Sequence, residues 1–107
     1  MMIRGSVHWV DLNPTIGAEI NKLRPCVIVG AAPINLARHT VVVVPLSTAP
    51  KARPPVTISV SCLDKQVIAV CDQIRTVDKS RLRKSAGQLS AKDLHALDDA
   101  LRQVLAL

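Results

Sequence analysis

The stretch Thr40-Val41-Val42-Val43-Val44-Pro45 is an almost unbroken run of β-branched residues, which favour extended backbone. Similar short runs lie on both sides of it in the chain. They cover residues 6–12, 25–29, 56–60 and 67–71. The separators are rich in Pro, Ala, Ser and Lys, and no helical pattern is evident between the runs. Parallel neighbours would need long crossovers, so this spacing predicts antiparallel pairing and a mainly β, half-open barrel.

A long polar segment follows the first predicted strand. That strand ends at Asn13-Pro14-Thr15, where proline and asparagine favour a turn. Residues 13–24 then contain Gly17 and several charges without strand or helix periodicity, up to Pro25. We predict a long exposed loop here.

The C-terminal segment changes to a helical period. Ser90 followed by Asp93 fits a capping pattern. Apolar residues then fall on one helical face, namely Leu94, Leu97, Leu101, Val104 and Leu105, whereas charged residues lie elsewhere. We predict one α-helix packed on the barrel.

Length and composition indicate one domain that spans residues 1–107. Hydrophobic residues make up 49% of the chain, but it has no Phe or Tyr and one Trp, so the core must be aliphatic. The apolar runs are too short to span a bilayer, and the first residues lack the apolar stretch of a signal peptide. We therefore expect a cytoplasmic protein without a membrane partner.

Charge and cysteine content restrict the partners. Fourteen Lys and Arg against eight Asp and Glu give a net charge of +6, which favours a polyanion: nucleic acid, an acidic protein tail or an anionic membrane. The alternative is that the charge serves only solubility. Three cysteines without C-x-x-C spacing predict buried free thiols instead of disulfides or a thiolate metal site.

Several separate blocks of the sequence resemble the MazF/PemK family of toxin ribonucleases. The blocks, in order, are Arg4-Gly5, Trp9-Val10-Asp11-Leu12-Asn13-Pro14-Thr15, Gly17, Glu19, Arg24-Pro25, Pro45-Leu46-Ser47-Thr48 and Cys71-Asp72-Gln73-Ile74-Arg75-Thr76-Val77-Asp78-Lys79. The resemblance extends from Arg4 through the last predicted helix. It implies an SH3-like barrel that forms a homodimer and cleaves single-stranded RNA without a metal or other cofactor. It also implies a MazE-like antitoxin, whose acidic C-terminal segment lies across the RNA groove.

RNA carries its own nucleophile, so a metal-independent enzyme must align the 2′-OH and stabilise the charged phosphorane. Cleavage by this route leaves a 2′,3′-cyclic phosphate and a 5′-OH. Arg24 is our first candidate, because its guanidinium can bind two phosphate oxygens and the resemblance places the catalytic arginine at this Arg-Pro step. Its role is charge stabilisation first and general acid second, since arginine is a poor proton donor. Ser47 stands where the family usually has threonine, and Thr48 is the alternative if the register shifts by one.

The candidates for the proton acceptor are Glu19, Asp72 and His8. In some relatives an aspartate at the Asp72 position acts with an arginine two residues earlier, but this chain has Val70 there. Another relative uses a loop histidine where this chain has Ala18. Neither version of the mechanism transfers to this chain, so the base stays open among the three candidates.

Polar residues around the loop are candidates for RNA contacts. They are Asn13, Thr15, Asn21, Lys22, Thr48 and Gln73. Stacking of several bases is not available, because Trp9 is the only large ring, and we interpret Trp9 itself as a core residue. The sequence has no H-x-x-x-H motif or carboxylate cluster, so we predict no metal site.

Two rival functions remain open. One is a toxin on the same barrel that poisons a protein, like the gyrase-poisoning CcdB relatives, but these lack the Arg-Pro and Pro-x-[Ser/Thr] blocks. The other is an RNA-binding module that has lost catalysis, which Ser47 and Val70 leave possible. Incubation with single-stranded RNA in excess chelator distinguishes these functions.

Overall fold

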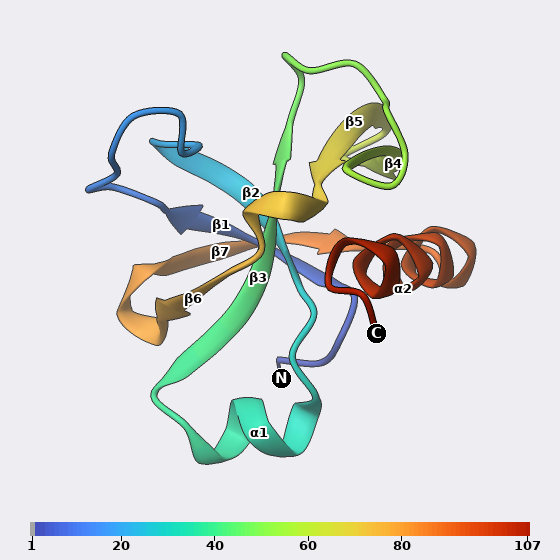
Figure 1. Cartoon of the computed structure of the whole chain (residues 1–107). Coiled ribbons are helices and arrows are strands. Elements are labelled where there is room, and N and C mark those ends of the chain that lie inside the picture. Colours follow the sequence, from blue (N-terminus) through green and yellow to red (C-terminus); the bar gives the residue numbers. More distant parts are fainter. Residues whose placement is uncertain (1) are drawn as a thin grey trace.

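The computed structural model describes residues 2–107, which form seven strands, two α-helices and two 3-10 helices (Figure 1). Their order is β1 (Ser6–Asp11), β2 (Leu23–Ile28), α1 (Ala32–Ala37), β3 (Thr40–Ser47), β4 (Thr57–Cys62), β5 (Lys65–Val70), η1 (Cys71–Gln73), β6 (Arg75–Asp78), η2 (Lys79–Arg81), β7 (Leu82–Gln88) and α2 (Ala91–Val104). The mainly β prediction is confirmed, and each of the five predicted strands overlaps an observed one.

The sheet is antiparallel throughout and curls around the long strand β3. Its order is β4-β5-β3-β2-β1-β7, and β6 adds to β3 off this path. On one edge β3 pairs first with β6, from Thr40 to Val43, and then with β5, at Leu46 and Ser47. Because one strand changes partner along its length, the sheet closes partly on itself. The predicted half-open barrel is therefore confirmed (Figure 1).

Helix α1 and strands β6 and β7 were not predicted from the sequence. The expectation of no helix between the strands is wrong, because α1 lies between β2 and β3. Pro33 fits its first turn, and Asn35 is buried there, donating from Nδ2 to the carbonyls of Gly30 and Met2. Strands β6 and β7 follow η1, which contains Asp72, and lie beyond the last strand that the sequence predicts, at residues 67–71. The mostly exposed, polar strand β7 has no apolar alternation, and its pairing with β1 defines it.

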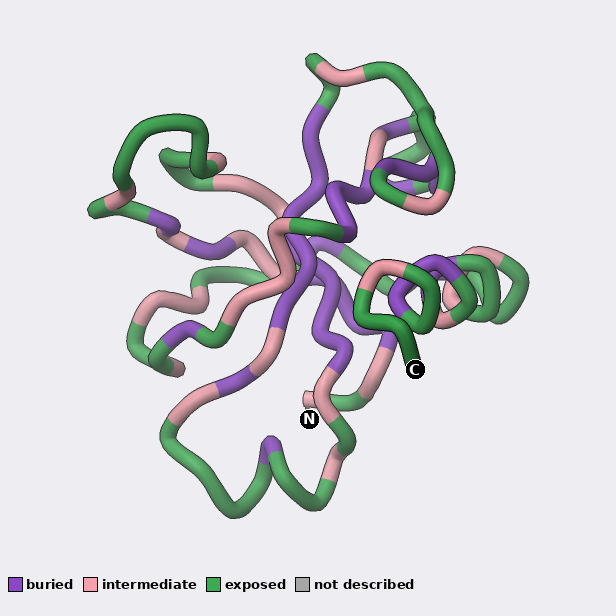
Figure 2. Tube along the Cα trace, viewed as in Figure 1, coloured by how far each residue is buried: buried purple, intermediate pink, exposed green. Residues whose placement is uncertain are grey.

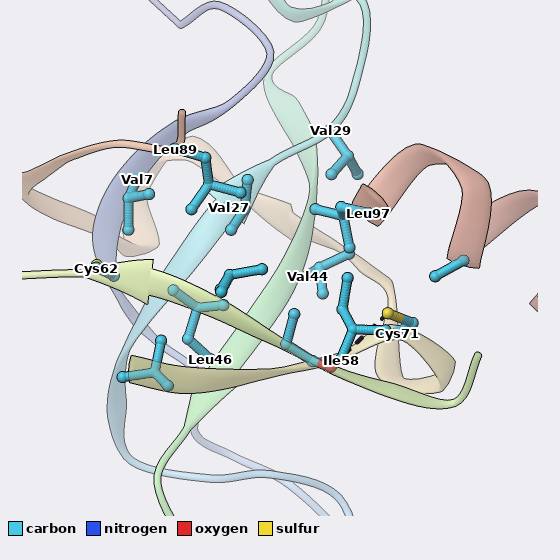
Figure 3. Close-up of a cluster of buried hydrophobic side chains, with 14 of the residues drawn as sticks. Val7, Val27, Val29, Val44, Leu46, Ile58, Cys62, Cys71, Leu89 and Leu97 are labelled. Carbon is cyan, nitrogen blue, oxygen red and sulfur yellow. Dashed lines mark hydrogen bonds between the residues drawn. The ribbon is translucent and has the colours of Figure 1, made fainter. Parts of the chain in front are cut away.

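The core lies on both faces of the sheet around β1, β2 and β3. Figure 2 shows that the trace is mostly buried in the centre of the molecule. The larger cluster fills the space between the sheet, the β4–β5 hairpin and α2, with Leu97 of α2 close to Val44 and Val29 (Figure 3). The smaller cluster lies on the opposite face. Its buried members are Val10, Leu12, Cys26, Ile28, Val41, Val43 and Val77. Both clusters are aliphatic, as predicted.

The C-terminal helix begins where the sequence predicts. Ser90 is its N-cap, with Oγ accepting a hydrogen bond from the Asp93 amide at 3.1 Å. Leu97 and Leu101 are buried, whereas Leu105 is 47% exposed because it follows the last helical residue. Asp98 attaches α2 to the segment before β1, because its carboxylate accepts hydrogen bonds from both Nη atoms of Arg4.

The three cysteines, Cys26, Cys62 and Cys71, are buried free thiols, as expected. Burial raises the pKa of Cys26 to about 12 and that of Cys71 to about 11. No helix within residues 2–107 is both long and apolar enough to cross a bilayer.

Candidate active site

Arg24 and Ser47 lie opposite each other on neighbouring strands. Strands β2 and β3 are antiparallel, with Cys26 opposite Pro45. The same register, continued toward the end of the pair, places Arg24 opposite Ser47. Directly opposed residues project from the same face of a sheet, so this pairing brings a guanidinium and a hydroxyl together.

Two hollows in the surface share these two side chains. One, which we call the loop hollow, has a volume of about 460 Å³ and is lined by Ala18, Glu19, Ile20, Asn21, Arg24, Ser47, Ala49, Pro50, Val70 and Gln73. The other, the rim hollow, has a volume of about 170 Å³ and is lined by Trp9, Leu23, Arg24, Pro25, Leu46, Ser47, Thr48, Cys62, Leu63, Lys65 and Val67. The two residues chosen from sequence as the phosphate-binding pair therefore share a cleft.

The Arg24 side chain is half-buried and held at one point. Its Nε donates to the carbonyl of Asn21 at 3.2 Å. Its Nη atoms make no hydrogen bond or ion pair with any other described residue, so they are free to bind an anion. The guanidinium is thus oriented by the loop while its planar donor edge remains available.

Ser47 is 9% exposed and lies at the end of β3. Its Oγ accepts a hydrogen bond from the Ala49 amide at 3.3 Å. Because that bond uses only a lone pair, the hydroxyl proton can be donated into the loop or rim hollow. Thr48, the alternative hydroxyl, is exposed; it lines the rim hollow but not the loop hollow.

Glu19 is the proton-acceptor candidate that shares a hollow with Arg24 and Ser47. Its Oε1 accepts from the Ile16 amide at 2.9 Å, which fixes the carboxylate within the loop. Within residues 2–107, Oε2 has no hydrogen-bond partner. Glu19 therefore combines a fixed position with a free oxygen in the hollow.

Gln73 fastens the loop on both sides of Glu19. Its Oε1 accepts from the Ile20 amide at 2.7 Å, and its Nε2 donates to the Ala18 carbonyl at 3.4 Å. The sequence suggests Gln73 as an RNA contact. In the structure its amide binds the loop backbone next to Glu19, and contact with RNA stays a prediction.

The other two acceptor candidates lie elsewhere. Asp72 lines a neighbouring hollow of about 410 Å³ with Glu19, Gln73 and Arg75, and neither Arg24 nor Ser47 borders it. His8 lies on β1, with its Nδ1 3.5 Å from the Arg83 carbonyl, and lines neither the loop hollow nor the rim hollow. The geometry favours Glu19 over both.

The predicted RNA contacts divide into two groups. Asn21 lines the loop hollow, and Thr48 lines the rim hollow. Asn13, Thr15 and Lys22 border neither, and the Asn13 Oδ1 accepts from the Lys22 amide at 3.2 Å, closing the base of the loop. Asn13 thus has a structural role that its residue type alone did not reveal.

Sequence analysis missed several residues around the site. Trp9, interpreted as a core residue, packs partly against the core but also borders the rim hollow together with Lys65. Arg75 donates to the Leu12 carbonyl at 3.4 Å, and Arg81 donates to the Asn13 carbonyl, so two arginines hold the start of the loop. Only the pairing of distant segments could have shown these contacts.

Two features limit the chemistry of the site. Val70 lines the loop hollow, so its wall is apolar at the position where some relatives carry arginine. Among residues 2–107, no three His, Cys, Asp or Glu side chains gather in a way that could hold a metal ion. The groups available for chemistry are a guanidinium, a hydroxyl and a carboxylate.

The sequence matches a family described as PemK-like, MazF-like toxin of type II toxin-antitoxin system, over residues 3–105. The endoribonuclease MazF9 of Mycobacterium tuberculosis is 38% identical over 116 aligned positions, which cover 100% of this chain and 98% of the relative. The endoribonuclease MazF of Staphylococcus saprophyticus is 34% identical, with 100% and 93% covered.

Solved structures share the fold. A crystal structure of MazF from Deinococcus radiodurans superposes with a TM-score of 0.87 at 20% identity, covering 98% of this chain and 96% of the other. An endoribonuclease from a Mycobacterial species, solved in complex with its cognate antitoxin, gives a TM-score of 0.82 at 24% identity, covering 98% and 95%.

Proposed function

The chain belongs to the family of PemK-like and MazF-like toxins of type II toxin-antitoxin systems, and we propose that it cuts single-stranded RNA where Arg24, Ser47 and Glu19 meet. Its full-length relatives are endoribonucleases, and the chain is an endoribonuclease toxin of this type. The proposal concerns the residues and the route of the reaction. The observation that carries it is that these three side chains line one hollow.

In the proposed reaction the ribose 2′ oxygen forms a bond to phosphorus and the bond from phosphorus to O5′ breaks. Glu19 accepts the 2′-OH proton, and O5′ gains a proton from Arg24. Water then carries the proton from Glu19 to Arg24, which restores both groups. The products are a 2′,3′-cyclic phosphate and a 5′-OH. No metal hydroxide is needed, because the nucleophile belongs to the substrate.

Arg24 and Ser47 act on the charge that develops on the phosphorane oxygens. The free guanidinium edge and the Ser47 hydroxyl are donors held before the substrate arrives, so little reorganisation is required during the reaction. Arg24 is therefore expected to contribute more than the scattered surface cations.

The test is digestion of a long single-stranded RNA in excess chelator. Arg24→Ala should lower the cleavage rate by about 100-fold or more, as for loss of a charge-stabilising donor. Arg102→Ala is the matched control, since Arg102 pairs only with the exposed Asp99 on α2. Circular dichroism checks that both variants fold.

The ends of the fragments test the route. A cyclic phosphate and a 5′-OH support it, whereas a 5′-phosphate product would show attack by water or a metal hydroxide. Binding without cleavage would favour the non-catalytic RNA-binding function, and neither binding nor cleavage would favour poisoning of a protein target.

We further propose a MazE-like antitoxin as partner, with an acidic C-terminal segment across the same cleft. The support is the net charge of +6 and the related toxin solved with its cognate antitoxin. We also propose that the toxin acts in the cytoplasm as a homodimer. Apolar side chains on α1, with Ile34 59% and Leu36 86% exposed, offer a surface for a second copy.

A further inference from the structure

A β-bulge places two cations beside the only tryptophan of the chain. On β1 and β7, His8 lies opposite Ser85 and Val10 lies opposite Leu82. One residue on β1, Trp9, therefore faces two on β7, which are Arg83 and Lys84. Such bulges redirect side chains and are common near active sites.

These residues form an open hollow of about 590 Å³, lined by Trp9, Leu23, Arg83 and Lys84. We call it the tryptophan shelf. Trp9 packs partly against the core, and Leu23 is 50% exposed, so the floor is apolar and fixed. The edge is cationic. The Nη2 atom of Arg83 lies 3.8 Å from Oδ2 of Asp11. Within residues 2–107, Lys84 makes no side-chain hydrogen bond or ion pair.

The tryptophan shelf adjoins the candidate active site. Trp9 and Leu23 line both the shelf and the rim hollow, and the rim hollow also contains Arg24 and Ser47. A strand whose phosphate lies between Arg24 and Ser47 can thus reach the shelf with a neighbouring nucleotide. The shelf and the phosphate site form one continuous surface.

We propose that the tryptophan shelf holds one unpaired nucleobase next to the cleaved phosphodiester, stacked on Trp9, with Lys84 and Arg83 near the flanking phosphate. The inference rests on the proposed function, because it takes the strand position from Arg24 and Ser47. A nucleotide satisfies both parts of the shelf, since its base has a flat π face and its phosphate is anionic. An acidic peptide would match the cations but leave the indole face unmatched.

Because the chain has one Trp and no Tyr or Phe, its fluorescence reports on Trp9, which lines the shelf and the adjoining rim hollow. The probes are a short mixed-sequence 2′-O-methyl RNA, which lacks the attacking hydroxyl, and an abasic strand with the same backbone. The base-bearing strand should quench Trp9 at saturation. The abasic strand should bind, as measured by anisotropy competition, without quenching.

Kinetics give the second readout. Trp9→Leu should raise KM for RNA cleavage by about 5- to 150-fold, the range expected for loss of one stacked base, with kcat within about twofold. Trp9→Phe should restore most of the loss. If Trp9→Leu fails to fold, Lys84→Ala replaces it, and its KM should rise more than that of Lys92→Ala, a control on the exposed face of α2.

The proposal of a stacked base would be contradicted by equal quenching with the abasic strand or by no quenching with RNA. An unchanged KM in Trp9→Leu would also contradict it, as would equal KM values for Lys84→Ala and Lys92→Ala. Quenching by an acidic peptide but not by RNA would assign the surface to a protein segment and also overturn it. Glu19→Gln separates this inference from the proposed function, because Glu19 is assigned the 2′-OH proton and no phosphate contact, so the variant should lose cleavage and keep the quenching. If RNA quenches Trp9 in the wild-type protein but is not cleaved, the proposed function would be refuted and the proposal of a stacked base would still hold.

Discussion

At the residue scale, Ser47 is the position where this chain departs from the threonine usual in its family. The hydroxyl is retained and is anchored by the Ala49 amide, at 3.3 Å from Oγ. A threonine would add a methyl group that restricts rotation about χ1. The departure therefore affects how firmly the donor is held, while the donor itself is retained.

We predict that Ser47→Thr cleaves RNA at least as fast as the wild type, because it keeps the hydroxyl and fixes its rotamer. Ser47→Ala should lower kcat by about 10- to 100-fold through loss of a donor to the phosphorane. Single-turnover cleavage measures both rates. Thr48→Ala is the control, and a loss confined to that variant would mean that Thr48 is the functional hydroxyl.

The choice among the proton acceptors also belongs to this scale. The sequence left the choice among Glu19, Asp72 and His8 open, because each is a titratable group whose distance from Arg24 and Ser47 depends on the fold. The loop had to fold back onto η1 before Glu19 reached the hollow of Arg24 and Ser47. That contact joins segments more than fifty residues apart, which no local pattern encodes.

At the element scale, the loop between β1 and β2 depends on one side chain from η1. Gln73 bonds the backbone on both sides of Glu19, and Arg75 and Arg81 hold the start of the loop. The sequence predicted the loop and its exposure. It did not predict the fastening, because the amide and guanidinium groups come from elements that follow much later in the chain.

We predict that Gln73→Leu lowers kcat by about 10- to 100-fold with little change in KM, since it displaces Glu19 without removing a phosphate contact. Hydrogen exchange should show faster loss of the Ile20 amide proton, which Gln73 protects. Gln66→Leu, at an exposed position of the β4–β5 hairpin, is the control. Unchanged exchange at Ile20 would contradict the fastening role.

The attachment of α2 gives a prediction about stability. Asp98 accepts from both Nη atoms of Arg4, whose Nε donates to the Val29 carbonyl at 2.8 Å, and this pairing raises the pKa of Arg4. Asp98→Ala should lower the free energy of unfolding by about 1–2 kcal/mol, because Arg4 then loses its partner.

Urea unfolding followed by circular dichroism measures the change. Asp99→Ala is the matched control: its ion pair with Arg102 is solvent-exposed, and it should cost less than about 0.5 kcal/mol. Equal effects of the two variants would show that the Arg4 pairing adds nothing beyond a surface contact.

At the scale of the whole molecule, the sequence predicted the fold class better than the strand inventory. Runs such as Thr40 to Pro45 indicate strands because β-branched residues carry the signal themselves. Strand β7 lacks that signal, and its polar side chains become a strand only through pairing with β1. Arg24 and Ser47 could be chosen in advance by resemblance, whereas their shared cleft required the β2–β3 register.

Because the thiols are buried, the stability of the whole molecule should decrease as the pH rises into the alkaline range. Burial raises the pKa of Cys26 to about 12, whereas an unfolded cysteine titrates near about 8.5. Above that value the unfolded chain releases a proton that the folded chain keeps. The contribution of each such thiol to the free energy of unfolding should therefore be constant below about pH 8 and fall by about 1.4 kcal/mol per pH unit between the two pKa values.

Denaturation between pH 8 and about pH 10 measures this slope before lysines titrate, and the chain has no tyrosine to interfere. Cys26→Val, which removes the titrating group and retains an apolar side chain, should reduce the slope by about one thiol's share. An identical slope in the variant would mean that Cys26 does not keep its proton in the folded protein.

The loop between β1 and β2, held by Gln73, Arg75 and Arg81, also affects how quickly the toxin engages RNA. An enzyme whose recognition segment must first close over its ligand shows a concentration-independent step in rapid mixing. Here the loop is already held by hydrogen bonds at its base and its middle, so the observed rate of binding should increase linearly with RNA concentration. Such a toxin would be ready to act the moment it is released.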